Sequence, residues 1–458
     1  MLLLSTRPLF RAALRPSSLL PAVSVSAPRS YSIAPTRKRF DKPKSDPLRI
    51  LFCGSDYFSS DSLKVLHDEM VSPDPDLGGK GGLIKSIDVM VRPPKPTGRG
   101  NKEIYKLPLH LQAEAFGLPI YERDTFTGWD IPSHINLIIA VSFGLFVPRR
   151  ILSQAKYGGL NVHPSILPDL RGPAPIHHAI LNNYTYTGVS VQTLSPEAFD
   201  HGTVLAHTPA GRFLIGPHET TGSLRRELGL QGAKMLIRVL KQNLHVQPHV
   251  DVSPKVPNLI HAPKISIKDK QVDWLVTRQS LSHLSSQPPS ARIYNQQRAL
   301  GTLWTHVRHR RPEDTNFDPF TKGQYTRVQL EGISVPSEPE LTFEEAVKQQ
   351  DEQYWNVIDW AQSNEAGGEL RFIPARWALS DNPEKPGQIV VEIPPNAKQP
   401  FSHPNPTLIY IDTMKIAGEA AKDAVDVAKR LGSRRMTLSG LRDVQAANLG
   451  VKKQWGGI

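Results

Sequence analysis

Two polar side chains end a strand that is otherwise apolar. In the stretch GGLNVHPSILPDLRGPAPIHHAI, Asn161 and His163 are two residues apart. Because side chains alternate between the faces of a strand, both point the same way at its end, where Pro164 interrupts the hydrogen-bond ladder. A carboxylate follows later at Asp200, and Gly202 lets the chain turn tightly enough to present it to the same pocket. An amide, an imidazole and a carboxylate are therefore predicted to meet in one site.

This combination suits acyl transfer to a neutral amine without a covalent enzyme intermediate. The amide of Asn161 and an imidazolium at His163 can both donate to the oxygen of a tetrahedral intermediate. The carboxylate of Asp200 keeps the imidazole protonated and orients it, or a bridging water. Each residue alone also has a structural alternative, since an Asn at a strand end is commonly a turn former and a single His is commonly structural. The sequence leaves that alternative open.

The elements before this strand predict an α/β sheet that would hold the site. Segment 48–66, LRILFCGSDYFSSDSLKVL, runs from an apolar strand through a Gly turn into a helix with Asp and Ser as N-cap candidates. Strands are predicted over 86–91 and 135–144, with a helix between them that Gly117 stops. This alternation indicates a Rossmann-like, mostly parallel sheet with helices on both faces and chemistry at the carboxyl ends of the strands. The G-x-G-x-x-G motif is missing after the first strand, so no NAD site is predicted.

The second half of the chain has a different pattern. A helix is predicted from Thr220 to about Leu244, and the Pro-rich segment 251–262 is interpreted as a linker. Beyond it, the short alternating stretches QVDWLV, GTLWTHVRH, QYTRVQLEGI, GQIVVEI and TLIYIDTMKI predict a small β-barrel.

Two segments interrupt these patterns. Residues 70–84 and 310–386 are rich in Gly, Pro or acidic side chains and are expected to be insertions. The predicted organisation is therefore a catalytic domain over 45–250 and a barrel domain with long insertions over 263–458.

The first forty residues have the composition of a targeting segment. They contain no Asp or Glu, and Arg7, Arg11 and Arg15 would form one basic stripe on a helix. Residues 1–44 are predicted to be a mitochondrial transit peptide and its lead, cut after Tyr31, with a disordered basic tail as the alternative. The cut would remove four arginines and lower the formal charge from +12 to +8, which still favours a nucleic-acid partner.

The composition argues against several classes of protein. A single cysteine, Cys53, excludes an intramolecular disulfide and a Cys-based zinc cluster. No apolar run approaches the roughly 18 residues of a membrane helix, so no membrane partner is predicted. His163 has no His, Cys or carboxylate at ligand spacing, and no metal is predicted.

A loop rich in Pro, Gly and cations lies between the second predicted strand and the helix that follows it. Its sequence, RPPKPTGRGNKEIYK over 92–106, has too little apolar content to join a core. The loop is either simply solvated or a mobile basic finger that engages phosphates at the edge of the active site.

Several motifs together resemble one enzyme family. NVHPSILPDLRGPAPIHHAI with TGVSVQTLSPEAFDHGTVL is similar to the formyltransferase catalytic core, and the SxLPxxRGPAPI form of the loop is similar to the branch that formylates methionyl-tRNA. PPKPTGRGNK, VSFGLFVPRRIL, APKISIKDKQVDW and YIDTMKIAGEAAKDA resemble other parts of that family, so the likeness covers nearly the whole chain after the transit peptide. It implies formyl transfer from 10-formyltetrahydrofolate to initiator methionyl-tRNA in the mitochondrial matrix. It also implies an OB-like C-terminal barrel. A monomer is expected, because large single-site enzymes of this layout work well as monomers.

The resemblance implies roles for individual residues. Asn161 and His163 would polarise the formyl oxygen. Asp200 would maintain the protonation states that allow the amine to attack and then to lose its proton. The residues implied to bind the folate are Phe143, Gly144, Leu145, Ser165, Leu167 and Pro168. The residues implied to bind tRNA are Lys95, Arg99, Lys102, Arg171, Arg308, Arg310 and Arg434.

One residue departs from the family pattern. Asp169 stands where relatives commonly carry a basic or aromatic residue, and it is expected to place a negative charge near RNA.

Three other functions are weighed against this one. They are a formyltransferase for a small amine such as a sugar-nucleotide amine, a folate deformylase that uses water, and a non-enzymatic RNA-binding relative. The basic loop and the basic second domain argue against the first two, because a small substrate needs neither. The complete set of Asn161, His163 and Asp200 argues against the third.

Overall fold

The computed structural model describes residues 44–72, 82–98, 100, 103–272, 274, 288–308, 325–336, 343, 346, 355–363, 370–393, 407–431 and 434–436. The expected transit peptide lies outside these ranges, as do most of the 70–84 segment and the residues Arg99, Lys102 and Arg310.

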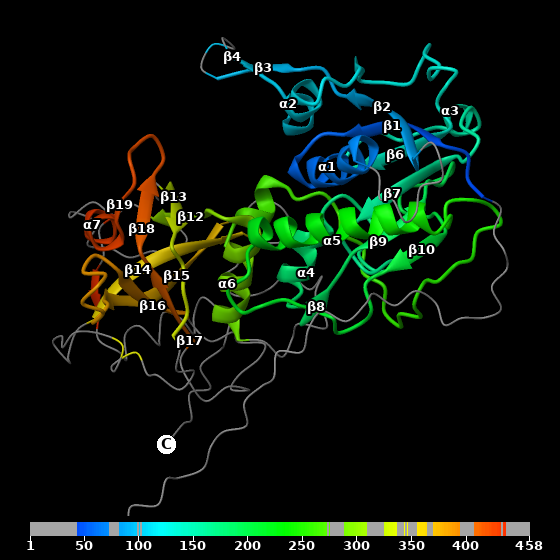
Figure 1. The fold of residues 1–458 in the computed structure, drawn as a ribbon. Helices are drawn as coiled ribbons and strands as arrows, with labels where there is room; N and C mark the ends of the chain where they lie inside the picture. The colour runs from blue at the N-terminus through cyan, green and yellow to red at the C-terminus, as the bar shows by residue number, and fades with distance from the viewer. Residues whose placement is uncertain are drawn as a thin grey trace, which may run out of the picture. The chain divides into compact units, whose positions relative to one another are not determined.

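A seven-stranded sheet forms the centre of the first half of the chain (Figure 1). Its strands are β1 (Leu48–Gly54), β2 (Ile84–Val91), β5 (Ile120–Glu122), β6 (Leu137–Val141), β7 (Gly159–His163), β9 (Ser190–Thr193) and β10 (Val204–His207). They lie in the order β10-β9-β7-β6-β1-β2-β5. The strands from β7 to β5 are parallel, whereas β9 and β10 extend the sheet in antiparallel pairs. The prediction of a mostly parallel sheet is confirmed.

Two long helices lie side by side on one face of this sheet. Helix α1 (Tyr57–Val71) begins after Asp56, whose carboxylate accepts a hydrogen bond from the Ser59 backbone N–H at 3.1 Å, so the predicted Asp N-cap is confirmed. Helix α5 (Thr221–Lys241) packs against α1 and against β7, β9 and β10. Its apolar stripe includes the fully buried Leu228 and Leu236.

The opposite face of the sheet is covered mainly by irregular chain. A buried apolar cluster joins Leu51, Cys53 and Ile138 of the sheet to Phe126 and Ile131 of the segment between β5 and β6. The helix on this face, α3 (Arg149–Leu152), is only four residues long. The expectation of helices on both faces is therefore only partly correct, because the covering apolar residues here lack helical spacing. Burial raises the pKa of the Cys53 thiol, which keeps it neutral.

The basic loop contains a short hairpin. Strand β3 (Lys95–Thr97) pairs antiparallel with β4 (Glu103–Tyr105), and all six residues are exposed. The prediction that this loop stays out of the core is confirmed. The elements that complete the first half are α2 (Pro108–Ala115), α4 (Pro175–Leu181), β8 (Tyr186–Thr187) and β11 (Phe213–Leu214), with β8 and β11 paired.

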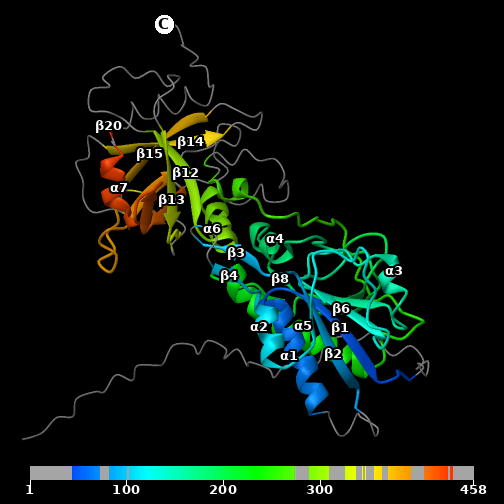
Figure 2. The ribbon, with the colours of Figure 1, turned by 90° about the horizontal axis from the view of Figure 1, so that it is seen from above.

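An antiparallel sheet occupies the second half of the chain. Its strands are β12 (Leu303–Arg308), β13 (Tyr325–Glu331), β14 (Trp355–Ser363), β15 (Leu370–Leu379), β16 (Ile389–Ile393), β17 (Thr407–Ile411), β18 (Thr413–Ile416), β19 (Lys422–Asp423) and β20 (Arg434–Met436). They run in the order β17-β16-β15-β14-β12-β13-β18-β19, with β20 beside β14. Helix α7 (Ala424–Arg430) contacts β18 and lies beside these strands (Figure 2). Backbone hydrogen bonds of 3.1 and 2.9 Å between Ser334 and Tyr410 also tie edge strand β17 to the residues after β13.

The structure corrects the expectation for residues 310–386. Strands β14 and β15 lie within that segment and form an eight-pair ladder, so this part belongs to the sheet. Their buried side chains include Ile358 and Trp360, which are two residues apart and therefore lie on the same face of β14. The surrounding polar and acidic runs mask this period in the sequence. The strand expected at QVDWLV is not formed by its described residues, of which Gln271 makes one isolated bridge to Trp304.

The end of the predicted linker is also more ordered than expected. The Ala262 N–H donates to the Arg171 carbonyl at 2.7 Å, and the Leu170 N–H donates to the Ile260 carbonyl at 2.9 Å. A 3-10 turn, η1 (Ile267–Lys270), follows. Helix α6 (Pro289–Leu300), which the sequence analysis missed, then packs against α4 and α5.

The N-cap of α5 allows a first test of local stability. The Thr220 side chain accepts a hydrogen bond from the Ser223 N–H at 3.2 Å, and the Ser223 hydroxyl accepts one from the Thr220 N–H at 2.9 Å. Thr220→Ala should lower the free energy of unfolding by about 1 kcal/mol, because it leaves an orphan N–H at the helix end. Thermal unfolding should show a drop in Tm of about 2–4 °C. Thr97→Ala on the exposed hairpin is the control, and a Tm equal to wild type for both would contradict the role of the cap.

Candidate active site

Adjacent strands bring three polar side chains to the same face of the sheet. Strand β9 pairs with β7 so that Asn161 lies opposite Gln192 and His163 lies opposite Ser190. Paired residues of neighbouring strands project on the same face, so the amides and the imidazole converge. The predicted common direction of Asn161 and His163 is confirmed.

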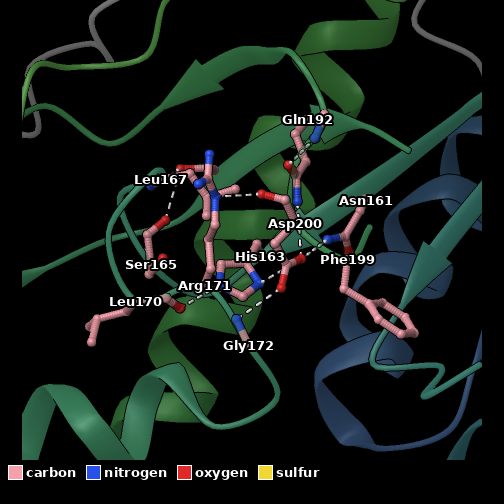
Figure 3. A network of polar contacts seen from close by, with 12 residues as sticks. Asn161, His163, Ser165, Leu167, Leu170, Arg171, Gly172, Gln192, Phe199 and Asp200 are labelled. Atoms are coloured by element: carbon pink, nitrogen blue, oxygen red, sulfur yellow. Dashed lines mark hydrogen bonds and ion pairs between the residues drawn. The ribbon is translucent and has the colours of Figure 1, made fainter. Parts of the chain in front are cut away.

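A carboxylate enters this group from the loop between β9 and β10 (Figure 3). Oδ1 of Asp200 accepts hydrogen bonds from Asn161 Nδ2 at 3.2 Å and from Gln192 Nε2 at 3.1 Å. Its Oδ2 accepts one from the Gly172 N–H at 3.0 Å. The Asp200 side chain is only 10% exposed, so these donors replace most of its hydration.

The turn that presents this carboxylate depends on a glycine. Asp200 itself has a φ of +57°, and the Gly202 N–H donates to Gln192 Oε1 at 3.2 Å. A Cβ on Gly202 would lie 1.6 Å from the Thr193 carbonyl oxygen. The predicted tight turn at Asp200-x-Gly202 is therefore confirmed, and it has no room for a side chain.

His163 lies between the carboxylate and a backbone carbonyl. Its Nδ1 is 3.4 Å from Asp200 Oδ1, and its Nε2 is 3.0 Å from the Leu170 carbonyl oxygen. A carbonyl oxygen only accepts, so Nε2 carries a hydrogen, and a second hydrogen on Nδ1 would face the carboxylate favourably. Both ring nitrogens therefore face acceptors within the protein. Asn161 uses one of its two amide hydrogens for Asp200, so the other can serve a ligand in the cavity.

Hydrogen bonds to Ser190 and within the loop itself fix the proline-containing loop after β7. The Ser190 hydroxyl donates to the Ser165 carbonyl at 2.8 Å and accepts from the Leu167 N–H at 3.0 Å. Ser165 donates its own hydroxyl to the Asp169 carbonyl at 2.6 Å. These bonds hold the loop rigidly beside the three polar side chains.

A cavity of about 880 Å³ opens over this group. Of the residues that the resemblance assigns to folate, Phe143, Gly144, Leu145 and Pro168 line the cavity. Ser165 and Leu167 are buried, do not line it, and support the loop instead. The cavity wall also includes Asn161, His163, Arg171, Gln192 and Asp200.

The residues assigned to tRNA are spread over the chain. Lys95 is exposed on β3, whereas Arg171 lies in the cavity wall and donates from Nε to the Asp200 carbonyl at 2.8 Å. Arg308 ends β12 and Arg434 begins β20. Arg99, Lys102 and Arg310 lie outside the described residues.

Sequence reasoning missed three parts of the site. Gln192 bridges Asp200 to the Gly202 turn, and its place two residues from Ser190, on the other side of Val191, is the signal that could have identified it. Phe146 and Phe199 form an edge-to-face pair in the cavity wall, with their ring centroids 5.3 Å apart. Residues 259–261, from the predicted linker, line the cavity as well.

The structure corrects the role expected for Asp169. Its Oδ2 accepts a hydrogen bond from the Tyr184 hydroxyl at 2.8 Å, and its Oδ1 accepts one from the Ile260 N–H at 2.8 Å. The carboxylate is thus engaged within the protein and does not simply present negative charge to a partner.

Metal binding and membrane insertion are two further properties that the described residues address. Within the described ranges, no three His, Cys, Asp or Glu side chains come together as a metal ion would require. Of the helices in the described part of the chain, none is long and apolar enough to cross a membrane.

Part of the chain matches a family of known proteins. Residues 78–240 match the family described as "Formyl transferase". The chain is 30% identical over 314 residues to "Methionyl-tRNA formyltransferase, mitochondrial" of Saccharomyces cerevisiae, covering 59% of this chain and 74% of that protein. It is 32% identical over 266 residues to the protein of the same name from Homo sapiens, covering 56% of this chain and 60% of that protein. Among solved structures, that of WlaRD, a sugar 3N-formyl transferase, has a TM-score of 0.41 at 15% identity and covers 72% of this chain and 98% of its own.

The crowded turn at Gly202 gives a sharp test of the site's construction. Gly202→Ala places a methyl group against the Thr193 backbone, so the turn must open, and we expect a loss of at least about 2 kcal/mol of stability. Thermal unfolding should show a fall in Tm of several degrees. Gly216→Ala is the matched control, because a Cβ there meets only the flexible Glu219 side chain at 3.4 Å. Equal Tm values for the two variants would contradict the close approach.

Proposed function

The chain belongs to the methionyl-tRNA formyltransferase family, and from this premise we propose that it transfers the formyl group of 10-formyltetrahydrofolate to the α-amine of methionyl-tRNA. The observation that carries the proposal is the convergence of Asn161, His163 and Asp200 at one cavity. The product would be formylmethionyl-tRNA for initiation of mitochondrial translation.

The cavity has the properties that these substrates need. Its volume of about 880 Å³ is within the range of sites that bind drug-sized ligands. Phe143, Leu145 and Phe146 provide apolar wall for a flat ring, and Gly144 brings backbone close to the ligand. Asn161 keeps one amide hydrogen for the formyl oxygen.

Residues of the site would stabilise the developing negative charge and guide the proton transfer. 10-Formyltetrahydrofolate supplies the formyl carbon, to which the amine nitrogen forms a bond while the bond from that carbon to the folate nitrogen breaks. Asn161 donates to the formyl oxygen as negative charge develops on it. The proton lost by the amine has to reach the departing folate nitrogen, and Asp200 with His163 orients the group or water that carries it. No covalent bond to the enzyme is required.

We assign a second group of residues to the RNA. The exposed hairpin with Lys95 and the adjoining Arg99 and Lys102 would contact phosphates of the acceptor stem. Arg171 would face the tRNA end inside the cavity. The antiparallel sheet of the second half would be an OB-like barrel whose surface, including Arg308, Arg310 and Arg434, follows the tRNA backbone. The bridge between Ser334 and Tyr410 supports the barrel, because it returns edge strand β17 toward β13.

The same proposal includes a cellular location and an assembly state. Segment 1–44, whose first forty residues contain arginines and no Asp or Glu, would direct the chain to the mitochondrial matrix and be removed there. One chain holds the whole Asn161, His163 and Asp200 group, so a monomer suffices for the reaction.

The first prediction from this proposal concerns activity. The mature chain, incubated with 10-formyltetrahydrofolate labelled in the formyl group and with charged methionyl-tRNA, should transfer label to the tRNA. Label released as formate would favour the deformylase, and label passed to a sugar-nucleotide amine in place of tRNA would favour the small-amine enzyme. Binding of tRNA with no turnover of either kind would favour the non-enzymatic relative. Each of these results counts against the proposal.

The second prediction concerns the catalytic group. Asn161→Ala should lower kcat by about 100- to 1,000-fold, the usual cost of one oxyanion donor. Asp200→Ala should also reduce turnover by orders of magnitude, because Asn161, His163 and Gln192 lose their common acceptor, while tRNA binding is retained. Asp251→Ala, at an exposed site, is the control. Wild-type turnover in Asp200→Ala would remove the carboxylate from the mechanism.

The third prediction concerns RNA recognition. Lys95→Ala should weaken tRNA binding and reduce the slope of log affinity against log salt by about one, as expected for one lost phosphate contact. Arg99→Ala should act in the same direction. Lys85→Ala provides the matched control, since Lys85 is also an exposed lysine but lies at the start of β2. A change in folate affinity rather than tRNA affinity would contradict this assignment.

A further inference from the structure

We infer that Asp169 is a positioning residue for formyl transfer, which fixes residues 259–262 against the loop that holds Asp200 and His163. The inference rests on the proposed function and adds to it a residue outside the group of Asn161, His163 and Asp200.

The side chain of Asp169 joins two distant parts of the chain. Its two carboxylate oxygens accept separate hydrogen bonds, one from the Tyr184 hydroxyl and one from the Ile260 N–H, both at 2.8 Å. Burial, and then the hydrogen bond to the carboxylate, raise the pKa of Tyr184, so its hydroxyl remains a donor. The carboxylate thereby connects the segment after α4 to the segment after α5.

Backbone pairing extends the connection from Asp169 toward the site. The Leu170 N–H donates to Ile260, the Ala262 N–H donates to Arg171, and the Ala174 N–H donates to Ala262 at 3.2 Å. A Cβ on Gly172, whose φ is +119°, would lie 2.5 Å from the Ala262 carbonyl oxygen, so the two segments are in close contact.

The same loop holds the catalytic group on its other side. Three consecutive residues take part: the Leu170 carbonyl accepts from His163, Arg171 donates to the Asp200 carbonyl, and the Gly172 N–H donates to the Asp200 carboxylate. The loop is thus bonded to segment 259–262 on one side and to Asp200 and His163 on the other. A shift of that segment would move the donors that fix the reacting geometry.

Apolar packing alone does not set this alignment. Leu170, Ala179 and Ala262 form a small buried cluster against Ile260, but such contacts are non-directional. The hydrogen bond to the Ile260 N–H is directional and, together with the backbone hydrogen bonds, fixes which residue of the segment lies beside the loop. Leu259 and His261, on either side of Ile260, line the cavity, so the same bond also sets the position of that wall.

The test compares two substitutions at the same position. Asp169→Ala removes both hydrogen bonds. Asp169→Asn can keep them, because its oxygen can accept from Ile260 and its amide can donate to the Tyr184 oxygen. At saturating methionyl-tRNA, Asp169→Ala should lower kcat at least tenfold, with KM for 10-formyltetrahydrofolate within threefold of wild type. Asp169→Asn should stay within threefold of wild type in both. Hydrogen exchange at the amides of residues 259–262 should accelerate in Asp169→Ala but not in Asp169→Asn.

If Asp169→Ala does not fold, two conservative tyrosine variants test the inference in its place. Tyr184→Phe removes only the donor to Asp169, and Tyr186→Phe makes the same change at the more exposed tyrosine two residues along the chain. We expect a lower kcat and faster hydrogen exchange at the amides of residues 259–262 in Tyr184→Phe alone.

Several results would overturn the inference. They are a wild-type kcat in Asp169→Ala, an Asp169→Asn as impaired as Asp169→Ala, or a loss confined to folate affinity. If Asp169→Ala does not fold, equal behaviour of the two tyrosine variants would overturn it instead. Absence of formyl transfer by the wild-type chain is a different outcome, because it contradicts the proposed function itself.

Discussion

The site depends on keeping one nearly buried carboxylate charged. Removing a carboxylate from water is costly unless charges and hydrogen bonds compensate it. Asp200 receives its compensation from Asn161, Gln192 and the Gly172 N–H, with the His163 ring beside it. Each of these donors comes from a different place in the chain, so the order of β7 and β9, the loop after β7 and the turn before β10 all have to be correct together.

The parts of this arrangement that follow from local chain geometry were predictable. Alternation along β7 places Asn161 and His163 on one face whatever surrounds them, and Gly202 permits the tight turn after Asp200. The continuous apolar segments of β1 and β6 likewise specify buried parallel strands. In these cases the physical cause lies within a few residues of its effect.

Other features depend on pairings between distant residues, which no local pattern contains. The contribution of Gln192 requires the register between β7 and β9, and the role of Asp169 requires Ile260, 91 residues away. Strands β14 and β15 were hidden by the polar runs around them, although each carries a buried tryptophan, Trp360 and Trp377, in the paired ladder. The linker was misjudged for a related reason. Its prolines and polar residues indicate low order in isolation, whereas its order comes from hydrogen bonds to the 170–174 loop.

Asp169 shows how the surroundings of a residue can account for its charge. A basic side chain at this position could not accept from both the Ile260 N–H and the Tyr184 hydroxyl, and a buried polar group left unpaired is costly. The acidic residue is consistent with its surroundings in this chain, because its two carboxylate oxygens accept two hydrogen bonds. A charge that looks unfavourable for RNA binding in the sequence thus acts, in the structure, on the segment that completes the catalytic cavity.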